Sequence, residues 1–326
     1  MLNNEGAATL LHLGAGHLGH LFRRIDLVEL LIEAFKVAEK PPLRQRIGTS
    51  GGGELLVMPA FSKGFSGVKI LTVTPGNSGT ERPAIQGLFA LFDTATGSPL
   101  ATIDAEALTG YRTAAVSAMA ASRLARADST KLTLLGSGHL IPFLAAAHAS
   151  VRPIAQVKLW ARNAERGEKA AERIRSRLPD IEVRVATDIE AAVGWGDIVC
   201  SATRSTDPLI LGRWLPEGVH LDLVGGYRPD MREIDDVGVS RSRVFVDTLD
   251  GALAEAGDLI IPLRAGRITS DAILGDLTDL ASSPLHRQEE REITLFKSVG
   301  TAAADLVVGA AAWKAYCDAS PRALAL

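Results

Sequence analysis

The stretch Lys131-Leu-Thr-Leu-Leu-Gly136-Ser-Gly138-His-Leu-Ile141 decides the fold of this chain. Its first five residues form a mostly apolar run that predicts a buried strand, and the two glycines predict a tight turn. The residues after the turn predict a helix over 140–149. A strand, a glycine-rich turn and a helix N-terminus in this order form a dinucleotide-binding element, because the turn brings unpaired backbone N–H groups close to the pyrophosphate.

Strands and helices alternate downstream of this element. We expect strands at 131–135, 157–160, 182–185, 197–201, 220–224 and 244–246, and helices at 140–149, 164–178 and 189–193. This alternation predicts an α/β fold with a doubly wound parallel sheet of the Rossmann type and right-handed crossovers. The apolar spacing over 293–316 predicts one or two packed helices.

The chain before residue 115 has a different pattern. Asp26 is a helix N-cap followed by apolar residues at spacings of three and four, and the predicted helix ends at Pro41-Pro42. Glycines and prolines then separate short apolar runs between 44 and 100, which predicts an antiparallel sheet with turns at 51–53 and 96–97. An alanine-rich helix is expected over 114–127.

A second glycine motif competes for the cofactor. Gly14-Ala-Gly16-His-Leu-Gly19 matches the GxGxxG pattern, but the helix downstream is capped separately at Asp26 and no second parallel strand is expected there. We therefore interpret this motif as an N-terminal turn. Ile141 replaces the third glycine of the downstream motif, which nevertheless has the required strand and helix on either side. The predicted phosphate-binding residues are Gly136, Ser137, Gly138, His139 and Leu140.

The residues after the predicted strand 157–160 indicate which of the two nicotinamide cofactors is preferred. An acidic residue there would bind a ribose 2′-hydroxyl, whereas this chain has Arg162 and Asn163. Because a guanidinium pairs with a 2′-phosphate, we expect both residues to bind the cofactor and NADPH to be preferred, with NADH possible. The other interpretation of Arg162 is a solvated charge at the end of a strand.

The charge balance and the cysteine content limit the class of protein. The 326 residues include 35 Lys and Arg against 38 Asp and Glu, a formal net charge of −3. This balance disfavours nucleic acids and anionic membranes as partners and favours a small-molecule substrate. Two cysteines and no Cys/His cluster indicate a reducing compartment and predict no metal site. Without a basic N-terminal signal region or a membrane-spanning run, we expect a cytoplasmic protein.

Three basic residues before the parallel domain are candidates for substrate chemistry. Lys69 alternates with apolar neighbours, so we expect its side chain to point from a strand into a cleft, where a lowered pKa suits a proton donor. Arg44 and Arg112 are candidates for holding a substrate carboxylate with two hydrogen bonds. The simpler interpretation of each of the three is a surface charge.

Several short motifs, in order along the chain, resemble the ornithine cyclodeaminase/mu-crystallin family. They are Val57-Met-Pro-Ala60, Gly67-Val-Lys69, Leu108-Thr-Gly-Tyr-Arg-Thr-Ala-Ala115, Gly136-Ser-Gly138, Trp214-Leu-Pro-Glu-Gly218, Gly225-Gly226 with Pro229 and Glu233, and Phe296-Lys-Ser-Val-Gly300. The resemblance implies a homodimer in which a Rossmann domain is inserted into a discontinuous α+β dimerisation and substrate domain. We therefore expect a substrate domain of 1–115 plus 293–326 and an NAD(P)-binding domain of 116–292.

The resemblance also implies roles for residues. Lys69 matches the substrate-side lysine of the family. The carboxylate-binding arginines fall on Arg112 and Arg44, or on Arg46 in a shifted register. Arg112 and Thr113 match positions beside the cofactor phosphates. Further residues that match segments near the cofactor are Ser201, Ala202, Thr203, Ser298, Val299 and Gly300.

At one motif this chain departs from the pattern of the cyclodeaminases in the family, and that difference bears on its activity. The cyclodeaminases that the chain resembles carry an acidic residue directly after the paired glycines and a lysine a few positions later, where this chain has Tyr227 and Met231. A phenol is a poor replacement for a carboxylate at neutral pH. The stretch resembles ketimine reductases instead. We therefore expect NADPH-dependent reduction of Δ1-pyrroline-2-carboxylate to L-proline, or of Δ1-piperideine-2-carboxylate to L-pipecolate.

In this interpretation Lys69 is the catalytic proton donor to the imine nitrogen. Tyr227 lines the substrate site, as a wall against a flat ring or as a hydrogen-bond donor, or it is a purely structural aromatic residue. The alternative functions are ornithine cyclodeaminase, alanine dehydrogenase and a ligand-binding protein that depends on NADPH but has no turnover.

Overall fold

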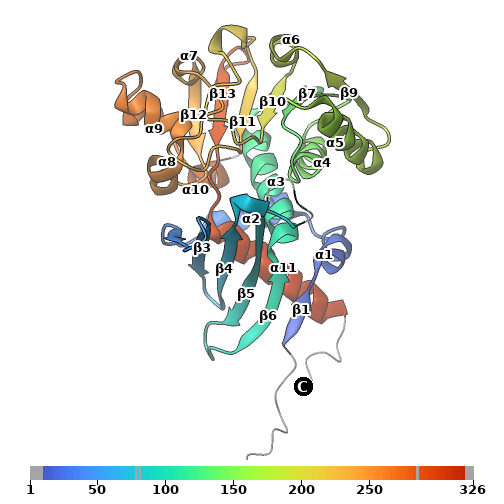
Figure 1. Ribbon diagram of the computed structural model, residues 1–326, viewed down its shortest axis with the longest axis vertical. Helices are drawn as coiled ribbons and strands as arrows, with labels where there is room; N and C mark the ends of the chain where they lie inside the picture. The colour runs from blue at the N-terminus through green and yellow to red at the C-terminus, as the bar shows by residue number, and fades with distance from the viewer. Residues whose placement is uncertain (1–9, 78–79, 81, 284–285, 320–326) are drawn as a thin grey trace, which may run out of the picture. The chain divides into compact units, whose positions relative to one another are not determined.

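The structure is a computed structural model that describes residues 10–77, 80, 82–283 and 286–319 (Figure 1). These residues form two compact units. The hairpin unit holds the described residues up to Leu30, residues 38–112 and those from Ala302 onward, and the parallel unit holds 31–37 and 113–301. The parts of the predicted domains at 1–9 and 320–326 lie outside the described residues. No helix in the described ranges is long and apolar enough to cross a membrane.

The parallel unit is built on a seven-stranded sheet in the order β12-β13-β11-β10-β7-β8-β9, and every strand pair in it is parallel. The strands are β7 (Lys131–Leu135), β8 (Gln156–Trp160), β9 (Glu182–Ala186), β10 (Ile198–Ser201), β11 (His220–Leu223), β12 (Ser242–Val246) and β13 (Ile293–Lys297). The helices are α4 (Ile141–Val151), α5 (Ala164–Arg177), α6 (Ile189–Val193), α7 (Asp236–Ser240), α8 (Leu249–Glu255), α9 (Gly257–Arg264) and α10 (Leu277–Ser282). The predicted α/β fold with a parallel sheet is confirmed.

The strand order of this sheet reverses between β7 and β10. The chain runs from β7 outward to β8 and β9, then returns to β10 on the other side of β7. Ligands of doubly wound sheets bind at the carboxyl ends of the strands that flank such a reversal. Gly136 directly follows β7 and Ala202 directly follows β10, so both residues lie at this edge.

Strand β13 corrects the prediction for the C-terminal segment. We expected helices from residue 293, but residues 293–297 form a strand between β11 and β12, and helix α11 (Ala302–Ala319) begins only after it. All five residues of β13 are buried. A strand that is covered on both faces need not alternate apolar and polar residues, so periodicity does not distinguish it from a buried helix. The two units divide the chain after residues 112 and 301, whereas the boundaries expected from sequence follow residues 115 and 292.

The hairpin unit contains a six-stranded sheet in the order β1-β6-β5-β4-β3-β2. The strands are β1 (Leu11–Leu13), β2 (Gln45–Gly48), β3 (Glu54–Phe61), β4 (Phe65–Val73), β5 (Ile85–Asp93) and β6 (Pro99–Asp104). Strands β2 to β6 pair antiparallel, as predicted. Strand β1, which pairs parallel with β6, and helix α1 (Ala15–Leu21) were not predicted.

Two further helices each contain a boundary between the units, so that one part of the helix belongs to each unit. The helix predicted at Asp26 is confirmed as α2 (Leu27–Phe35), and the carboxylate of Asp26 accepts hydrogen bonds from the backbone N–H groups of Val28 and Glu29. The alanine-rich helix is α3 (Ala105–Leu124), which begins nine residues before the predicted start at 114. Because α3 includes both Arg112 and Thr113, these neighbouring residues belong to different units.

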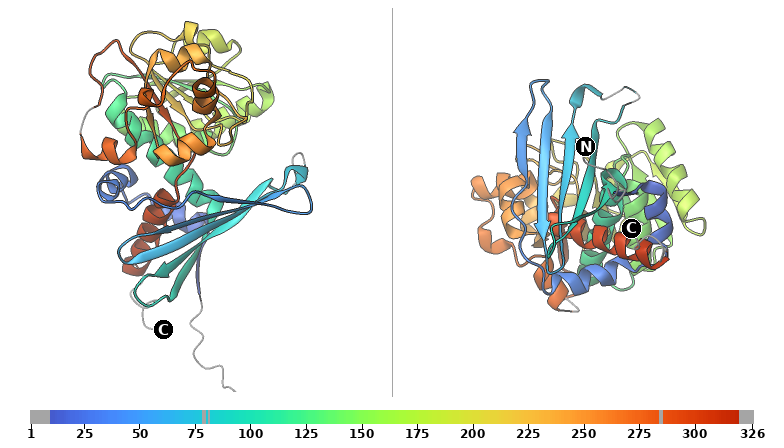
Figure 2. Two further views of the ribbon diagram at one scale, coloured as in Figure 1. Left: turned by 90° about the vertical axis from the view of Figure 1, so that its left-hand side faces the viewer. Right: turned by 90° about the horizontal axis from the view of Figure 1, so that it is seen from below.

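Helix α11 covers one face of the six-stranded sheet by packing on β3, β4 and β5 (Figures 1 and 2). Gly67 on β4 and Gly309 on α11 both lie against the ring of Phe89, where an added Cβ would be 2.4 Å and 2.9 Å from ring carbons. Glycine at these positions therefore allows the helix to approach the sheet closely. This approach brings the polar residues of α11 next to those of β4.

A buried carboxylate joins two helices to the parallel sheet. Asp222 on β11 accepts hydrogen bonds from Ser117 Oγ of α3 at 3.1 Å and from Cys200 Sγ of β10 at 3.1 Å, and it bonds His148 Nε2 of α4 at 3.0 Å. Burial raises the pKa of Asp222, but the bonds to His148 and Cys200 outweigh this effect and hold the pKa below its ordinary value. The charged carboxylate therefore connects α3, α4 and the central strands.

Replacing Asp222→Ala should lower the free energy of unfolding by about 3–5 kcal/mol, because buried polar groups lose their shared acceptor. Equilibrium unfolding in urea measures the loss. Asp128→Ala is the matched control, since the side chain of Asp128 is 79% exposed and pairs with Arg126, and it should change the free energy by less than about 1 kcal/mol. Equal small losses for both variants would contradict the role assigned to Asp222.

Candidate functional site

The glycine turn after β7 has the backbone geometry that a phosphate requires. Gly136 has a φ of +123°, and an added Cβ would lie 2.8 Å from the carbonyl oxygen of Ala202. Only glycine is therefore tolerated at this position. An added Cβ at Gly138 would meet nothing within 4 Å, so the turn is open at that point.

The N-terminus of α4 is not capped by a side chain. Its N-cap residue is Leu140, which makes no side-chain capping bond, and Pro142 stands in the first turn. Gly138 and His139 are exposed. An uncapped helix N-terminus at the reversal of a parallel sheet fits the pyrophosphate of a dinucleotide. The residues predicted for phosphate binding thus lie together at the expected edge of the sheet.

Basic residues of α5 lie close to this turn. Arg173 Nη2 donates a hydrogen bond to the carbonyl oxygen of Ser137 at 3.2 Å. The guanidinium of Arg177 lies 4.0 Å from the ring centre of Phe143, on the first turn of α4. Both cations add positive potential near the helix N-terminus, which favours an anion there. The prediction from sequence did not include either arginine.

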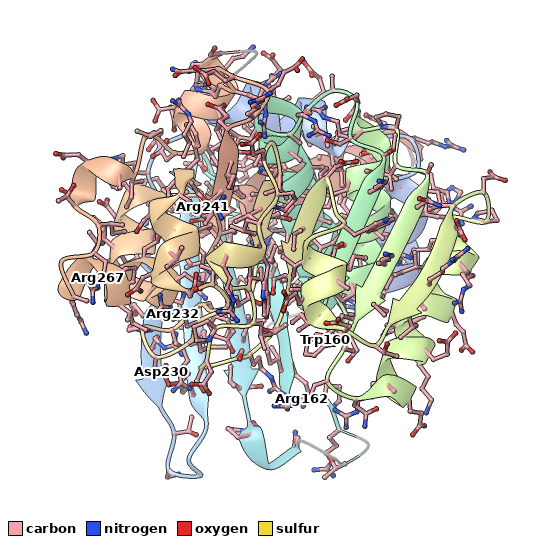
Figure 3. All side chains as sticks on the ribbon, turned by 90° about the horizontal axis from the view of Figure 1, so that it is seen from above. Trp160, Arg162, Asp230, Arg232, Arg241 and Arg267 are labelled. Carbon is pink, nitrogen blue, oxygen red and sulfur yellow. The ribbon has the colours of Figure 1, made fainter. Side chains whose placement is uncertain are left out.

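Arg162 lies just beyond the carboxyl end of β8, where it is exposed (Figure 3). Asn163 is the N-cap of α5, and its Oδ1 accepts a hydrogen bond from the backbone N–H of Arg166 at 2.9 Å. This bond explains Asn163 as a helix cap. Its role in cofactor binding, like that of Arg162, stays a prediction.

A buried glutamate holds the segment that follows β10. Glu233 Oε1 accepts hydrogen bonds from Ser201 Oγ at 2.6 Å and from the backbone N–H and hydroxyl of Thr203 at 2.7 and 2.8 Å. Burial raises the pKa of Glu233, against the opposing effect of the positive charge of Lys297. Ser201, Ala202 and Thr203, which were predicted to lie near the cofactor, are thereby fixed at the carboxyl end of β10.

A buried ion pair closes the neighbouring glycine loop. Lys297 Nζ lies 2.8 Å from Asp258 Oδ2 and also donates to the carbonyl oxygen of Gly225. Asp258 Oδ1 accepts from the backbone N–H of Glu233 at 2.6 Å. An added Cβ at Gly225 would lie 2.2 Å from the carbonyl oxygen of Thr203, so the paired glycines allow the loop to pack against the segment after β10. Sequence reasoning assigned no role to Lys297 or Asp258.

A second buried carboxylate, that of Asp247, holds the segment that follows β13. Its Oδ2 accepts hydrogen bonds from Ser298 Oγ at 3.0 Å and from the backbone N–H groups of Val299 and Gly300 at 2.9 and 2.6 Å. Burial raises the pKa of Asp247, although the bond from Gly300 opposes that shift. The three residues predicted near the cofactor from this segment therefore have a fixed backbone.

Thr113 and Tyr227 differ in what surrounds them. Thr113 is buried, and its Oγ1 has no hydrogen-bond partner among the described residues. A buried hydroxyl without a partner fits the predicted contact to a cofactor. Tyr227 packs, half-buried, against the hydrophobic core of the parallel unit, and Met231 is buried. This packing agrees with the structural interpretation of Tyr227, whose contact with substrate stays a prediction.

The hairpin unit contains a separate buried cluster of charges. Lys69 on β4 is 1% exposed, and its Nζ lies 2.8 Å from Oδ1 and 2.7 Å from Oδ2 of Asp305 on α11. Arg112 on α3 places its Nε 2.9 Å from Asp305 Oδ1. Three elements that are distant in sequence thus bring two cations to one carboxylate. The simpler interpretation of Lys69 and Arg112 as surface charges is wrong.

The ionisation of Lys69 is shifted toward neutral pH. The pKa of Lys69 is lowered to about 7: burial has the largest effect, the positive charges of Arg112 and Arg44 also lower it, and the charge and hydrogen bond of Asp305 oppose them. Arg44 is therefore close enough to act on this cluster. Arg46 instead pairs with Glu54 on the neighbouring strand at 2.8 Å. The electrostatic effect on Lys69 and the pairing of Arg46 with Glu54 favour Arg44 over Arg46 for the cluster, and the contact of either arginine with substrate stays a prediction.

Sequence reasoning missed Asp305, which completes the cluster. A signal was present, because Asp305 is the single acidic residue between 293 and 317. An acid in an otherwise apolar run that packs as a helix must be buried with a partner. The partner was not predictable from local pattern, because Lys69 lies 236 positions away.

A sequence model of the ornithine cyclodeaminase/mu-crystallin family matches residues 16–318 of the chain. The Delta(1)-pyrroline-2-carboxylate reductase of Colwellia psychrerythraea is 38% identical over 291 residues, which cover 86% of this chain and 92% of that protein.

Solved structures of similar proteins cover nearly the whole chain. The Thermococcus litoralis Delta(1)-pyrroline-2-carboxylate reductase in complex with NADH and L-proline is 31% identical and superposes with a TM-score of 0.89 over 95% of this chain and 98% of that one. An archaeal alanine dehydrogenase dimer with bound NAD is 26% identical, with a TM-score of 0.87 over 95% and 97% of the two chains. The resemblance expected from sequence is confirmed, and the chain belongs to the ornithine cyclodeaminase/mu-crystallin family.

Proposed function

We propose that this protein is an NAD(P)H-dependent oxidoreductase that reduces the C=N bond of a cyclic α-imino acid. The substrate is Δ1-pyrroline-2-carboxylate, which gives L-proline, and its six-membered homologue Δ1-piperideine-2-carboxylate gives L-pipecolate. The observation that carries the proposal is the buried pair of Lys69 and Arg112, which offers a proton donor and a carboxylate-binding group in one cluster. The Colwellia relative is named as a reductase of this imine, and the Thermococcus structure contains L-proline.

Arginines of the hairpin unit orient the substrate. Arg112 binds the substrate carboxylate together with Arg44, or with Arg46 in the other register, because a guanidinium matches the two oxygens of a carboxylate. Fixing the carboxylate also fixes the adjacent C=N carbon. This orientation removes most of the entropic cost of bringing that carbon to the hydride donor.

Lys69 supplies the proton that the imine nitrogen needs. Protonation of the nitrogen makes the adjacent carbon electrophilic, and Lys69 donates directly or through one water. Because burial and nearby cations lower the pKa of Lys69 to about 7, its ammonium is acidic enough to give up a proton near neutral pH. The amine then takes a proton back from solvent.

The residues of the parallel unit fit a nicotinamide dinucleotide, which supplies a hydride when bound. The turn at 136–140 and the uncapped N-terminus of α4 hold the pyrophosphate. The rest of the site is lined by the segments 201–203 and 298–300, which buried carboxylates fix, and by the hydroxyl of Thr113. This hydroxyl has no hydrogen-bond partner in the part of the chain that the structure describes. Arg162 gives a preference for NADPH by pairing with its 2′-phosphate.

One set of assays tests this function against its alternatives. We expect NADPH consumption with Δ1-pyrroline-2-carboxylate and Δ1-piperideine-2-carboxylate. NADPH consumption only with pyruvate and ammonia would identify an alanine dehydrogenase, and ammonia release from L-ornithine would identify a cyclodeaminase. Binding of NADPH without any turnover would identify a ligand-binding protein. Each of these three outcomes would overturn the proposal.

Replacing Lys69→Met should lower kcat for imine reduction by about 100-fold to 10,000-fold, the usual contribution of a positioned proton donor. KM should change far less, because the arginines remain. Steady-state kinetics measure both constants. Lys63→Met is the control, since Lys63 is exposed in the turn between β3 and β4, and the kcat of this variant should equal that of the wild type. An unchanged kcat for Lys69→Met would refute the assigned role.

Replacing Arg162→Ala should raise KM for NADPH by about 10-fold to 100-fold, because a charge-assisted hydrogen bond contributes about 1.5–3 kcal/mol. KM for NADH should stay unchanged, since NADH has no 2′-phosphate, and it serves as the internal control. A wild-type enzyme that prefers NADH by tenfold would contradict the expected cofactor preference.

The face of the six-stranded sheet opposite α11 supports the expected homodimer. Val57, Ile70 and Leu88 are cross-strand neighbours on the face opposite α11, and Val68 and Ala90 continue the apolar set. These side chains are half-buried or exposed, with Leu88 at 41%. A second copy of this chain would remove this apolar surface from water.

The variant Ile70→Asp should therefore be monomeric where the wild type is dimeric, because a carboxylate in an apolar interface is costly to desolvate. Light scattering coupled to size-exclusion chromatography gives the mass. Val237→Asp is the control, because Val237 is 52% exposed on a helix of the parallel unit, and this variant should stay dimeric. A dimeric Ile70→Asp protein would show that this face is not the interface.

We also place the protein in the cytoplasm. Its cysteines, Cys200 and Cys317, are both free and buried, which suits a reducing compartment.

A further inference from the structure

We propose that Asp305 is a positioning residue that sets the protonation of Lys69 and thereby the pH range in which the imine is reduced. The inference rests on the proposed function, because it assigns the proton of the reaction to Lys69. It concerns a residue on α11 that sequence reasoning did not include.

The contact between the two side chains is short and enclosed. Lys69 Nζ donates a hydrogen bond to Asp305 Oδ1 at 2.8 Å and lies 2.7 Å from Oδ2, so the ammonium faces both oxygens. Its other bond goes to Thr109 Oγ1 of α3 at 3.4 Å. Lys69 and Asp305 are 1% and 0% exposed, so water does not screen the pair.

The charged groups that act on Lys69 come from three other parts of the hairpin unit. Arg112 on α3 and Arg44, one residue before β2, are cations that disfavour the ammonium, and Asp305 on α11 is the one anion among the groups that shift its ionisation. If the Asp305 carboxylate is removed, burial and both cations all favour the neutral amine. Lys69 would then hold no proton to donate at neutral pH.

Arg112 explains why the proton goes to the substrate and not to Asp305. Its Nε lies 2.9 Å from Asp305 Oδ1, so the carboxylate keeps a cationic neighbour after Lys69 becomes neutral. A carboxylate beside a guanidinium resists protonation. In the reduction, the N–H bond of the Lys69 ammonium breaks and a new N–H bond forms on the imine nitrogen. A bound nicotinamide dinucleotide would supply the hydride for the new C–H bond at the imine carbon, which makes the product a secondary amine, and solvent returns the proton to Lys69.

The pH dependence of kcat/KM tests this assignment in Asp305→Asn. In the wild type, kcat/KM for imine reduction should fall as pH rises through the pKa of Lys69, about 7, because the donor loses its proton. In Asp305→Asn this fall should move to lower pH by at least about 1 unit, the usual effect of a nearby opposite charge. The ionisation of the imine is common to both proteins, so only the difference between them counts.

Two further variants separate an electrostatic role from a merely structural one. Thr109→Val removes the uncharged partner of Lys69 and should leave the position of the fall in kcat/KM within about 0.3 pH units of the wild type. Arg112→Gln removes a cation and should move the ionisation of Lys69 to higher pH, opposite to Asp305→Asn. A uniform loss of rate in Asp305→Asn at every pH, with the fall unmoved, would overturn the proposal. If Asp305→Asn does not fold, Asp305→Ser takes its place, and an unmoved fall in that variant would overturn the proposal.

A direct titration keeps this test independent of the reaction. The 13Cε chemical shift of Lys69, assigned by its loss in Lys69→Arg, reports the protonation of the amine without substrate. A lowered pKa in Asp305→Asn, seen by this shift, supports the role of Asp305 even where the imine assay fails and the proposed function with it. An equal pKa in both proteins overturns the role of Asp305 even where the imine is reduced.

Discussion

Buried carboxylates are the constraint on which the loops of this protein depend. In the parallel unit, Glu233 fixes the segment after β10, and Asp247 fixes the segment after β13. Asp222 ties α3 and α4 to the sheet. Breaking any of the two or three hydrogen bonds to a buried carboxylate costs free energy, because the carboxylate oxygen is then left without a partner in an apolar interior. Loops that lie at the carboxyl ends of parallel strands are therefore rigid, which suits a site that must position a hydride donor.

The two glycine motifs show how context decides function. Contrary to our expectation, the motif at 14–19 also follows a strand and begins a helix: Gly14 directly follows β1, and residues 15–19 belong to α1. However, β1 is the edge strand of the six-stranded sheet and its parallel neighbour β6 continues directly into α3, so the turn after β1 does not lie at a reversal of strand order. Gly136 follows a central strand, and Ala202 lies at the end of the adjacent one. The two motifs are distinguished by the reversal of strand order next to Gly136, and the letters of neither motif predict that reversal.

Features that depend on neighbouring residues were predictable from the sequence, whereas features that depend on residues far apart in the chain were not. The parallel strands and the hairpins were predicted because alternation and turn residues are local. Lys69 and Arg112 were predicted as candidates by their apolar surroundings and by the family resemblance. Asp305, Asp258 and Lys297 were missed because each of them acquires its role from a residue 25 or more positions away. Strand β13 was missed because burial on both faces removes the alternation that marks a strand.

The buried cluster of the hairpin unit also gives a reason for selecting a carboxylate substrate. Lys69 and Arg112 bring two positive charges to the single carboxylate of Asp305. A buried excess of positive charge is unfavourable, and an anionic group on the substrate reduces it. In the proposed reaction, Lys69 transfers its proton to the imine nitrogen while the carboxylate stays bound, so the positive charge leaves the lysine. The proposal therefore couples binding of an α-carboxylate to donation of a proton through the same three side chains.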